Sequence, residues 1–393
     1  MRFLTAGESH GPGLDIIVEG VPADLPLLPD DINQDLARRQ IGFGRGGRMT
    51  IEKDEVTFRG GVRLGRTIGS PIAMSLVNRD FQNWQVPMSV TPVDLDDPAI
   101  RAQVEARAIT RLRPGHADYP GAIKYGLSDV RNILERSSAR ETTSRVAAGA
   151  VAKQLLRQFN IHVHSHVLGI GGVLAEPRPE LPTFSEWKEF FAQVETNDLR
   201  TDPDSYSRLR ERIVAAAKGG YTLGGTVEIV VYGDVPIGLG SHVHYDRRLD
   251  GLLAGAVMSV HTVKAVEIGV GTMAAQRVGR EVQDEFQTGP QGEICRASNH
   301  AGGIEGGMTN GQPVLVRASL KPLPTMRNAL QSVDLLTHEA FAAHYERSDT
   351  CAVPAGGVVC EAMVAWVIAQ ELQKKYGGDS LGEMLRHART VPE

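Results

Sequence analysis

The segment RPGHAD, residues 113–118, carries two groups that could exchange protons on a predicted turn. Pro114 fixes φ and Gly115 lacks a Cβ, so a helix cannot continue through them. His116 and Asp118, with one residue between them, are therefore expected on a turn rather than on an apolar face. Imidazoles and carboxylates are common general acids and bases, which makes this turn the first candidate for catalysis.

A third candidate, His10, is also held on a turn, because Gly11 and Pro12 follow it in GESHGPG. A lone histidine is more often an ordinary surface or core residue, and that interpretation stays open for His10.

Two arginine-rich segments could bind an anion. A helix is predicted over residues 138–159, and Arg136, Ser137, Ser138 and Arg140 lie at its start. Hydroxyls, guanidinium groups and free N–H groups at a helix start favour an anion, although a serine cap with solvated arginines is the alternative.

The second arginine-rich segment follows a helix predicted over residues 31–40, capped by Asp30 or Asp31. It indicates a clamp for a multiply anionic small molecule, with a solvated basic patch as the alternative. Its members stand among four glycines and are Arg38, Arg39, Arg45 and Arg48.

Composition is that of an ordinary globular protein: 393 residues, 41% apolar and 23% charged. The net charge of −5 argues against a nucleic-acid binder, and three cysteines without a close pair fit a reducing cytoplasm. We expect no signal peptide and no membrane span, because the first residues lead directly into glycine and polar groups and no apolar run is long enough.

The remaining pattern favours a single large α/β domain over residues 1–393, because no repeat or disordered linker interrupts the chain. Residues 355–375 are apolar on more than one stripe, which predicts a buried central helix. Two peripheral helices are expected within residues 183–218, and another over 247–260. Strands are predicted over residues 14–19, 49–58, 72–77, 161–169, 225–232, 264–268 and 314–320.

Two apparent ligand motifs are set aside. His162, His164 and His166 share one face of a predicted strand, but no acidic or cysteine partner is adjacent, so no metal site is predicted. Residues 269–274 match G-x-G-x-x-A, yet no good helix and no acidic residue at the required distance follow.

Five motifs together resemble the chorismate synthase family and span essentially the whole chain. They are GESHGPG (7–13), RPGHAD (113–118), RSSARET (136–142), HAGGIEGGMTNGQP (300–313) and RSDTCAVPA (347–355). The resemblance implies an α+β fold with long core helices between antiparallel sheets, assembled as a homotetramer. It also implies anti-1,4-elimination of phosphate from 5-enolpyruvylshikimate 3-phosphate to give chorismate, with reduced FMN and no net redox change.

The resemblance further assigns roles to residues. His10 would stabilise or protonate the departing phosphate, His116 would lie at the flavin pyrimidine edge, and Asp349 would handle the proton at N5. The substrate clamp, which could instead hold a nicotinamide phosphate, would comprise Arg39, Arg45, Arg48, Arg113 and Arg140. The FMN site would comprise Arg136, Ser137, Ser138, His261, Thr262, Gly306, Lys321, Pro322, Leu323, Pro324, Thr325 and Arg347.

Two other classes remain open from the sequence. One is a net flavin or NAD(P)H oxidoreductase acting on an anionic metabolite, and the other is a non-catalytic phosphate- or nucleotide-binding module. We expect NADPH to act, if at all, only as a source of reduction, with an external flavin reductase supplying reduced FMN. No nucleic-acid or membrane partner is expected.

Overall fold

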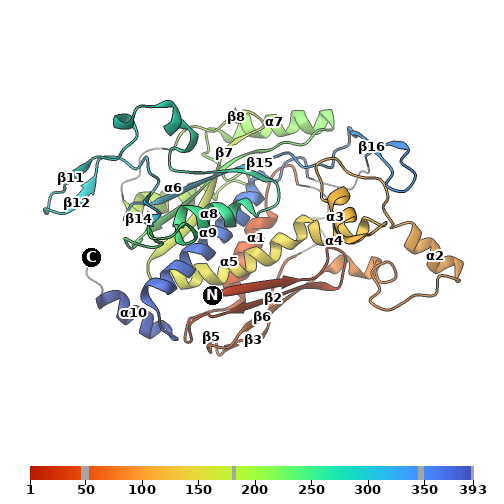
Figure 1. Cartoon of the computed structure of the whole chain (residues 1–393), viewed down its shortest axis with the longest axis horizontal. Coiled ribbons are helices and arrows are strands. Elements are labelled where there is room, and N and C mark those ends of the chain that lie inside the picture. Colours follow the sequence, from red (N-terminus) through yellow and green to blue (C-terminus); the bar gives the residue numbers. More distant parts are fainter. Residues whose placement is uncertain (46–52, 179–182, 344–348, 391–393) are drawn as a thin grey trace.

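Two antiparallel sheets enclose a layer of helices in the computed structural model, which describes residues 1–45, 53–178, 183–343 and 349–390 (Figure 1). In β2, Leu14, Ile16 and Val18 are buried and alternate with more exposed residues, so one face of the first sheet covers the helices. That sheet has the order β1-β2-β6-β3, formed by β1 (Arg2–Ala6), β2 (Gly13–Glu19), β6 (Ile72–Val77) and β3 (Thr57–Gly60).

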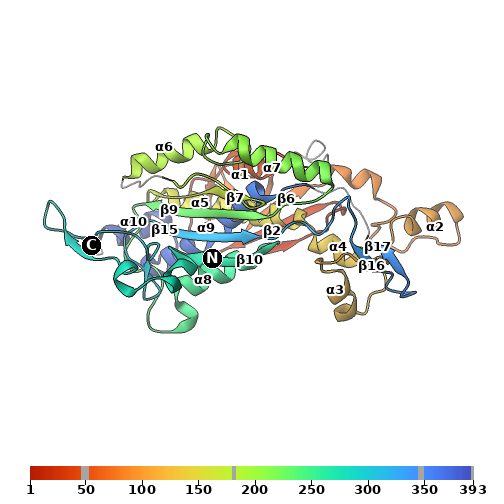
Figure 2. The ribbon, with the colours of Figure 1, turned by 90° about the horizontal axis from the view of Figure 1, so that it is seen from above.

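The second sheet lies on the other side of the helices and has the order β10-β15-β9-β7-β8. Two helices, α6 (Phe184–Val194) and α7 (Tyr206–Gly219), run along its outer side (Figure 2). Its strands are all antiparallel: β10 (Val263–Ile268), β15 (Val314–Leu320), β9 (Gly225–Gly233), β7 (Ile161–Ile170) and β8 (Val173–Leu174).

The central layer consists of α1 (Pro29–Gln40), α5 (Thr142–Arg157) and α9 (Val353–Tyr376). α9 is long and apolar enough to cross a membrane, but 89% of its most apolar window is buried, as in a core helix of a soluble fold. α5 and α9 approach closely where Gly149 faces Ala362, since a Cβ on Gly149 would lie 2.4 Å from the Cβ of Ala362.

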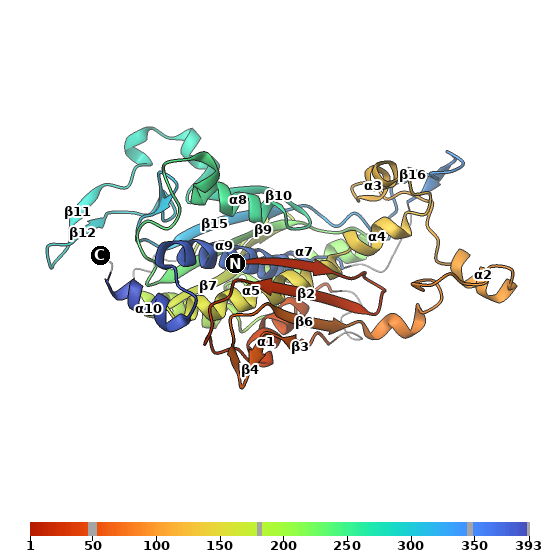
Figure 3. The same ribbon diagram turned by 60° about the horizontal axis from the view of Figure 1, so that its bottom comes forward.

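The remaining elements lie around this sandwich (Figure 3). α2 (Pro98–Glu105), α3 (Asp118–Tyr125), α4 (Arg131–Ser137) and the hairpin β16–β17 (Gln331–Val333, Ala340–Ala342) lie at the right in Figure 3. The others are α8 (Leu249–Met258), α10 (Leu381–Thr390) and three short hairpins: β4–β5 (Val62–Arg63, Arg66–Thr67), β11–β12 (Phe286–Thr288, Ile294–Arg296) and β13–β14 (Ile304–Glu305, Met308–Thr309).

The predicted architecture of core helices between antiparallel sheets is confirmed, as are the strand over residues 72–77, the buried helix over 355–375 and the two helices within 183–218. The strands over 14–19, 161–169, 225–232, 264–268 and 314–320 are also confirmed, with small differences at their ends. The helix predicted over 247–260 is shorter at both ends.

Three local predictions were wrong. The helix predicted from Ser138 begins only at Thr142, because Ser138 is extended and a 3₁₀ turn over Ala139–Glu141 intervenes. The helix predicted over residues 31–40 is α1, which begins earlier, at Pro29, so that Asp30 and Asp31 lie inside it and neither is its N-cap residue. The carboxylate of Asp31 accepts from the N–H of Leu28 at 2.7 Å. The strand predicted over 49–58 begins only at Thr57, and residues 49–52 lie outside the described residues.

Candidate active site

The turn that carries His10 is fixed by a carboxylate from α4. Glu135 accepts from the backbone N–H of His10 at 2.7 Å and from its ring Nδ1 at 2.8 Å. Trp84 stacks on the imidazole with ring centroids 4.0 Å apart. Asn78 completes the support, because its amide donates to the carbonyls of Glu8 and Gly11. His10 is therefore buried, and Glu135 fixes the orientation of its ring through Nδ1.

The RPGHAD turn closes on a buried ion pair. Asp118, the first residue of α3, accepts from Arg113 Nε at 2.8 Å and from Nη2 at 2.7 Å. Nδ1 of His116 donates to the same carboxylate at 2.6 Å. Burial raises the pKa of Asp118, but the hydrogen bonds from Arg113 and His116 outweigh it and hold that pKa well below its usual range. Asp118 is therefore ionised and orients both partners.

The segment after β15 packs against this turn. Lys321 Nζ donates to the carbonyl of Gly115 at 2.5 Å, and its backbone N–H donates to the carbonyl of Thr262 at 2.9 Å. Thr262 has φ +72°, which is strained for a β-branched residue. The Lys321–Thr325 segment and Thr262 thus border the turn that carries His116.

A second basic group gathers beside the end of α1. Arg39 is buried and donates to Thr142 Oγ1 at 3.0 Å and to Asp54 at 3.4 Å. Arg140 also binds Asp54, and Arg45 pairs with Asp349 at 3.2 Å.

The pKa of Arg39 is lowered to about 10, mainly by burial and also by the nearby charges of Arg45 and Arg140, against the opposing effect of Asp54. Three guanidinium groups so crowded favour an anionic ligand.

The His10 turn and the arginine cluster are joined by short polar contacts. Asn78 links the His10 turn to Arg140, since its Oδ1 accepts from Arg140 Nε at 2.8 Å. Ser9 and Ser138 share a hydrogen bond of 3.0 Å.

Arg136 donates to the carbonyls of Thr5 and Gly7, so the last turn of α4 holds the strand end that leads into the His10 turn. His261 lies 3.8 Å from Glu141. Burial lowers its pKa, Glu141 opposes this, and the charges of Arg145, His116 and Arg136 lower it further.

The structure therefore brings most of the predicted site residues to one end of the helix layer. Ser137 is at the end of α4, where its hydroxyl donates to Ile133, so Arg136 and Ser137 end one helix rather than begin the next. Gly306 is separate: Gly307 next to it accepts from the N–H of Leu249 at the start of α8, whereas His261 follows the end of that helix. Arg48 and Arg347 lie outside the described residues.

Sequence reasoning missed the residues that hold the predicted ones. These supporting residues lie far along the chain from the residues that they hold: they are Asp54, Trp84 and Glu135. What distinguishes Asp54 and Glu135 is that they are buried carboxylates, which becomes visible only in the structure. Arg38, expected in the clamp, instead turns into the core and binds Glu361.

The three histidines of β7 belong to an aromatic cluster. His164 stacks on Phe191 with centroids 5.0 Å apart, and its Nδ1 lies 3.1 Å from the hydroxyl of Tyr232. His162 packs against Phe184, and burial lowers the pKa of His164 to about 4.

Comparison with known proteins agrees with this geometry. The family model of chorismate synthase matches residues 1–373. A chorismate synthase of Gloeobacter violaceus is 78% identical over 390 residues, covering 99% of this chain and 98% of that protein. One from Geobacillus kaustophilus is 52% identical over 382 residues, covering 97% of this chain and 96% of that protein.

A crystal structure of a chorismate synthase aligns with a TM-score of 0.78 at 38% identity, covering 99% of this chain and 96% of that chain. These relatives do not support the alternative of a net oxidoreductase. The chain belongs to the chorismate synthase family of carbon–oxygen lyases.

Proposed function

We propose that this chain converts 5-enolpyruvylshikimate 3-phosphate to chorismate by anti-1,4-elimination. The observation that carries the proposal is the junction of the His10 turn with the arginine cluster through Asn78, whose amide contacts Gly11 on one side and Arg140 on the other. The substrate bears a phosphate and two carboxylates, which suit a group of crowded guanidiniums. In this proposal the clamp comprises Arg39, Arg45 and Arg140, which lie together, with Arg113 on the RPGHAD turn and Arg48, outside the described residues, as further members.

His10 acts on the leaving group in this proposal. When the C–O bond breaks, the electron pair leaves with the phosphate, and a hydrogen is lost from the ring to complete the elimination. An imidazolium at His10 would stabilise or protonate that phosphate, which is where a charged donor lowers the barrier most. The Glu135 carboxylate supports this role, because it accepts from the His10 Nδ1–H and so orients the ring.

The side chains around the RPGHAD turn, which carries His116, are suited to bind reduced FMN. Lys321, Arg136, His116 and His261 supply cationic and imidazole groups, and the His261 Nδ1 is buried without a hydrogen-bond partner among the described residues. Reduced FMN would supply electron density to the substrate and recover it, so that no net redox change results. His116 would lie at the flavin ring, and Asp349, held by Arg45, would hold or release a proton beside it. The remaining proposed contacts are Ser137, Ser138, Thr262, Gly306, Pro322, Leu323, Pro324, Thr325 and Arg347.

We further propose that the chain is one domain, acts in the cytoplasm as a homotetramer, and receives its reduced flavin from an external reductase. The continuous buried core shared by both sheets and the helix layer supports one domain. The G-x-G-x-x-A segment supports the absence of a Rossmann-type nicotinamide site, since Gly271–Gln276 is a 3₁₀ helix and not a long α-helix. NADPH remains only a source of reduction.

The test is an anaerobic spectrophotometric assay for chorismate with photoreduced FMN, oxidised FMN, oxidised FMN plus NADPH, or no flavin. Chorismate is expected only with photoreduced FMN. Product formed without any flavin would contradict the cofactor proposal, and bleaching of the flavin by NADPH alone would show that this chain carries its own reductase.

A further inference from the structure

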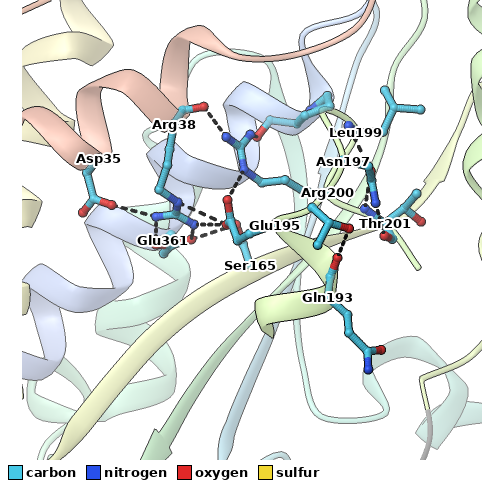
Figure 4. Close-up of polar contacts among 12 residues, drawn as sticks. Asp35, Arg38, Ser165, Gln193, Glu195, Asn197, Leu199, Arg200, Thr201 and Glu361 are labelled. Carbon is cyan, nitrogen blue, oxygen red and sulfur yellow. Dashed lines mark hydrogen bonds and ion pairs between the residues drawn. The ribbon is translucent and has the colours of Figure 1, made fainter. Parts of the chain in front are cut away.

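A buried group of charged side chains joins α1, α5, α9 and β7, and several of its members are drawn in Figure 4. At its centre, Arg38 on α1 donates to both carboxylate oxygens of Glu361 on α9, at 2.6 and 3.0 Å. The same guanidinium donates to Asp35 at 2.7 Å and to Glu195 at 2.6 Å. Because successive helix residues point about 100° apart, Arg38 faces this core while Arg39 faces the proposed substrate site.

The group is balanced in charge and tied to every neighbouring element. Glu361 is fully buried and also accepts from Lys153 on α5 and from the Ser165 hydroxyl on β7, the latter at 3.0 Å. Three carboxylates face three cations: Asp35, Glu195 and Glu361 against Arg38, Lys153 and Arg200. Removing one partner of a buried pair leaves its counterpart uncompensated, so the group holds the helices in one arrangement.

Arg200 extends this group to the backbone of the site. Its Nη2 donates to the main-chain carbonyl of Arg38, one of the last carbonyls of α1 that have no partner within the helix. Its Nη1 donates to the carbonyl of Pro354 in the first turn of α9 at 3.4 Å, and its Nε donates to Glu195 at 3.3 Å. One buried guanidinium therefore joins the end of α1 to the start of α9.

The loop that presents Arg200 is built for one conformation. Arg200 has φ +50°, a backbone region that residues other than glycine seldom occupy. The Asn197 side chain supports that bend, because its Oδ1 accepts from the N–H groups of Leu199 and Thr201 and its Nδ2 donates to the Thr201 carbonyl at 2.8 Å. Figure 4 shows this support beside the contact between Arg200 and Arg38.

The two backbone segments joined by Arg200 carry the proposed substrate and proton residues. The end of α1 carries Arg39 and leads to Arg45, and the segment before α9 carries Asp349. They meet again where the N–H of Thr350 donates to the carbonyl of Gly44 at 2.8 Å and where Arg45 pairs with Asp349.

We propose that Arg200, braced by Glu195, is a positioning residue that sets the distance between the Arg39–Arg45 segment and Asp349. This inference rests on the proposed function of those three residues. Arg200 touches no reacting atom in this proposal, and it acts through the two carbonyls that it holds. Losing it should displace Arg45 relative to Asp349 while leaving the flavin-side residues Lys321 and His116, which it does not contact, in place.

The test compares Arg200→Gln with Arg208→Gln, a change on α7 at an exposed arginine that pairs with Glu176 and Ser205. Steady-state kinetics with reduced FMN, the dissociation constant of FMN and the thermal midpoint are measured for each. Arg200→Gln is expected to raise the KM for 5-enolpyruvylshikimate 3-phosphate by roughly tenfold or more, because small displacements of binding groups are costly, and to leave FMN affinity within about twofold of the parent. Arg208→Gln should leave all three unchanged.

A double variant with Arg45→Ala separates the possible causes. If Arg200 acts through Arg45, the KM effects of Arg200→Gln and Arg45→Ala will be far from additive, and Arg200→Lys, which keeps one donor, will recover part of the loss. A normal KM with a lower kcat in Arg200→Gln, or fully additive effects, would overturn the inference. Should Arg200→Gln fail to fold, Glu195→Gln at the partly exposed end of the group is expected to raise KM in the same way, and an unchanged KM there overturns it.

The proposed function fails separately, because it requires Arg45→Ala itself to raise KM. A normal KM in Arg45→Ala would contradict the proposed anion site. A raised KM in Arg45→Ala, together with a normal KM in both Arg200→Gln and Glu195→Gln, would contradict only the positioning role of Arg200.

Discussion

The carboxylate of Glu135 holds His10 from two directions, accepting from its backbone N–H at 2.7 Å and from its ring Nδ1 at 2.8 Å. A carboxylate in this position fixes the tautomer and the orientation of an imidazole, so that Nε2 is the atom presented to a ligand. The relation is similar in kind to the orienting carboxylate of catalytic triads. In the proposed function, Glu135 therefore orients the histidine that acts on the leaving phosphate, without itself touching substrate.

We predict that Glu135→Gln lowers kcat by about 10- to 100-fold, because the amide cannot stabilise the charged imidazole and permits the wrong tautomer. FMN affinity should stay unchanged, since Glu135 contacts the His10 turn and Arg131 rather than the flavin side. Glu105→Gln on the exposed α2 serves as the control and should be silent. Normal turnover in Glu135→Gln would mean that the pair is structural only.

Two variants of the RPGHAD turn should distinguish an effect on activity from an effect on stability. His116→Gln should lower kcat by roughly 100-fold while the melting temperature is nearly kept, since Arg113 retains its bonds to Asp118. Asp118→Asn should lower both, because it leaves the buried Arg113 charge without its partner, at a cost of about 3–5 kcal/mol in unfolding free energy. Kinetics and thermal melts of the two variants check this. Equal thermal losses would contradict the division of roles.

Arg45→Ala should raise the substrate KM by about 10- to 100-fold, which corresponds to the loss of a hydrogen bond to a charged group. Secondary structure measured by circular dichroism should not change, because Arg45 lies after the end of α1. Arg59→Ala on the exposed side of β3 is the matched control. If both variants bind substrate equally well, the arginine cluster is not the substrate clamp.

Because burial lowers the pKa of His164, the stability of the fold should depend on pH. Its pKa is about 4 in the folded chain because of burial, below the ordinary value of about 6.5 in the unfolded chain. The unfolded state therefore takes up the proton first, and stability falls as pH drops from about 6.5 toward 4 and rises again on the return to neutral pH.

The melting temperature between pH 7.5 and 5 should fall for the parent and for the exposed control His242→Gln, and fall less for His164→Gln by roughly 2–5 °C. Identical pH profiles in all three proteins would show that His164 is not buried in its neutral form.

Much of the architecture could be predicted from local pattern. α9 is apolar around most of its circumference and could only be a buried helix, and the alternation of Leu14, Ile16 and Val18 identified a half-buried strand. The break at Ser138 could not be predicted, because the sequence from Ser138 onward has good helical propensity. It is imposed by contacts from a distant segment, including the hydrogen bond from Ser9 to Ser138 across 129 residues.

The site was predictable by residue type but not by pairing. His10, His116 and the arginines stood on turns and glycine-rich segments that a sequence reveals. Glu135 is 125 residues away from His10, and nothing local indicates that its carboxylate would bind that turn. Arg38 and Arg39 are adjacent and chemically alike, and only the tertiary placement of Glu361 and Asp54 decides which one faces the core and which one the site.

In the proposed reaction the enzyme uses reduced flavin without consuming it. An anaerobic reaction with limiting photoreduced FMN and excess 5-enolpyruvylshikimate 3-phosphate should be followed simultaneously for chorismate and for flavin absorbance. We predict many equivalents of chorismate per flavin, with the flavin still reduced at the end. The oxidation of one reduced flavin for each chorismate formed would contradict the account and establish a net oxidoreductase.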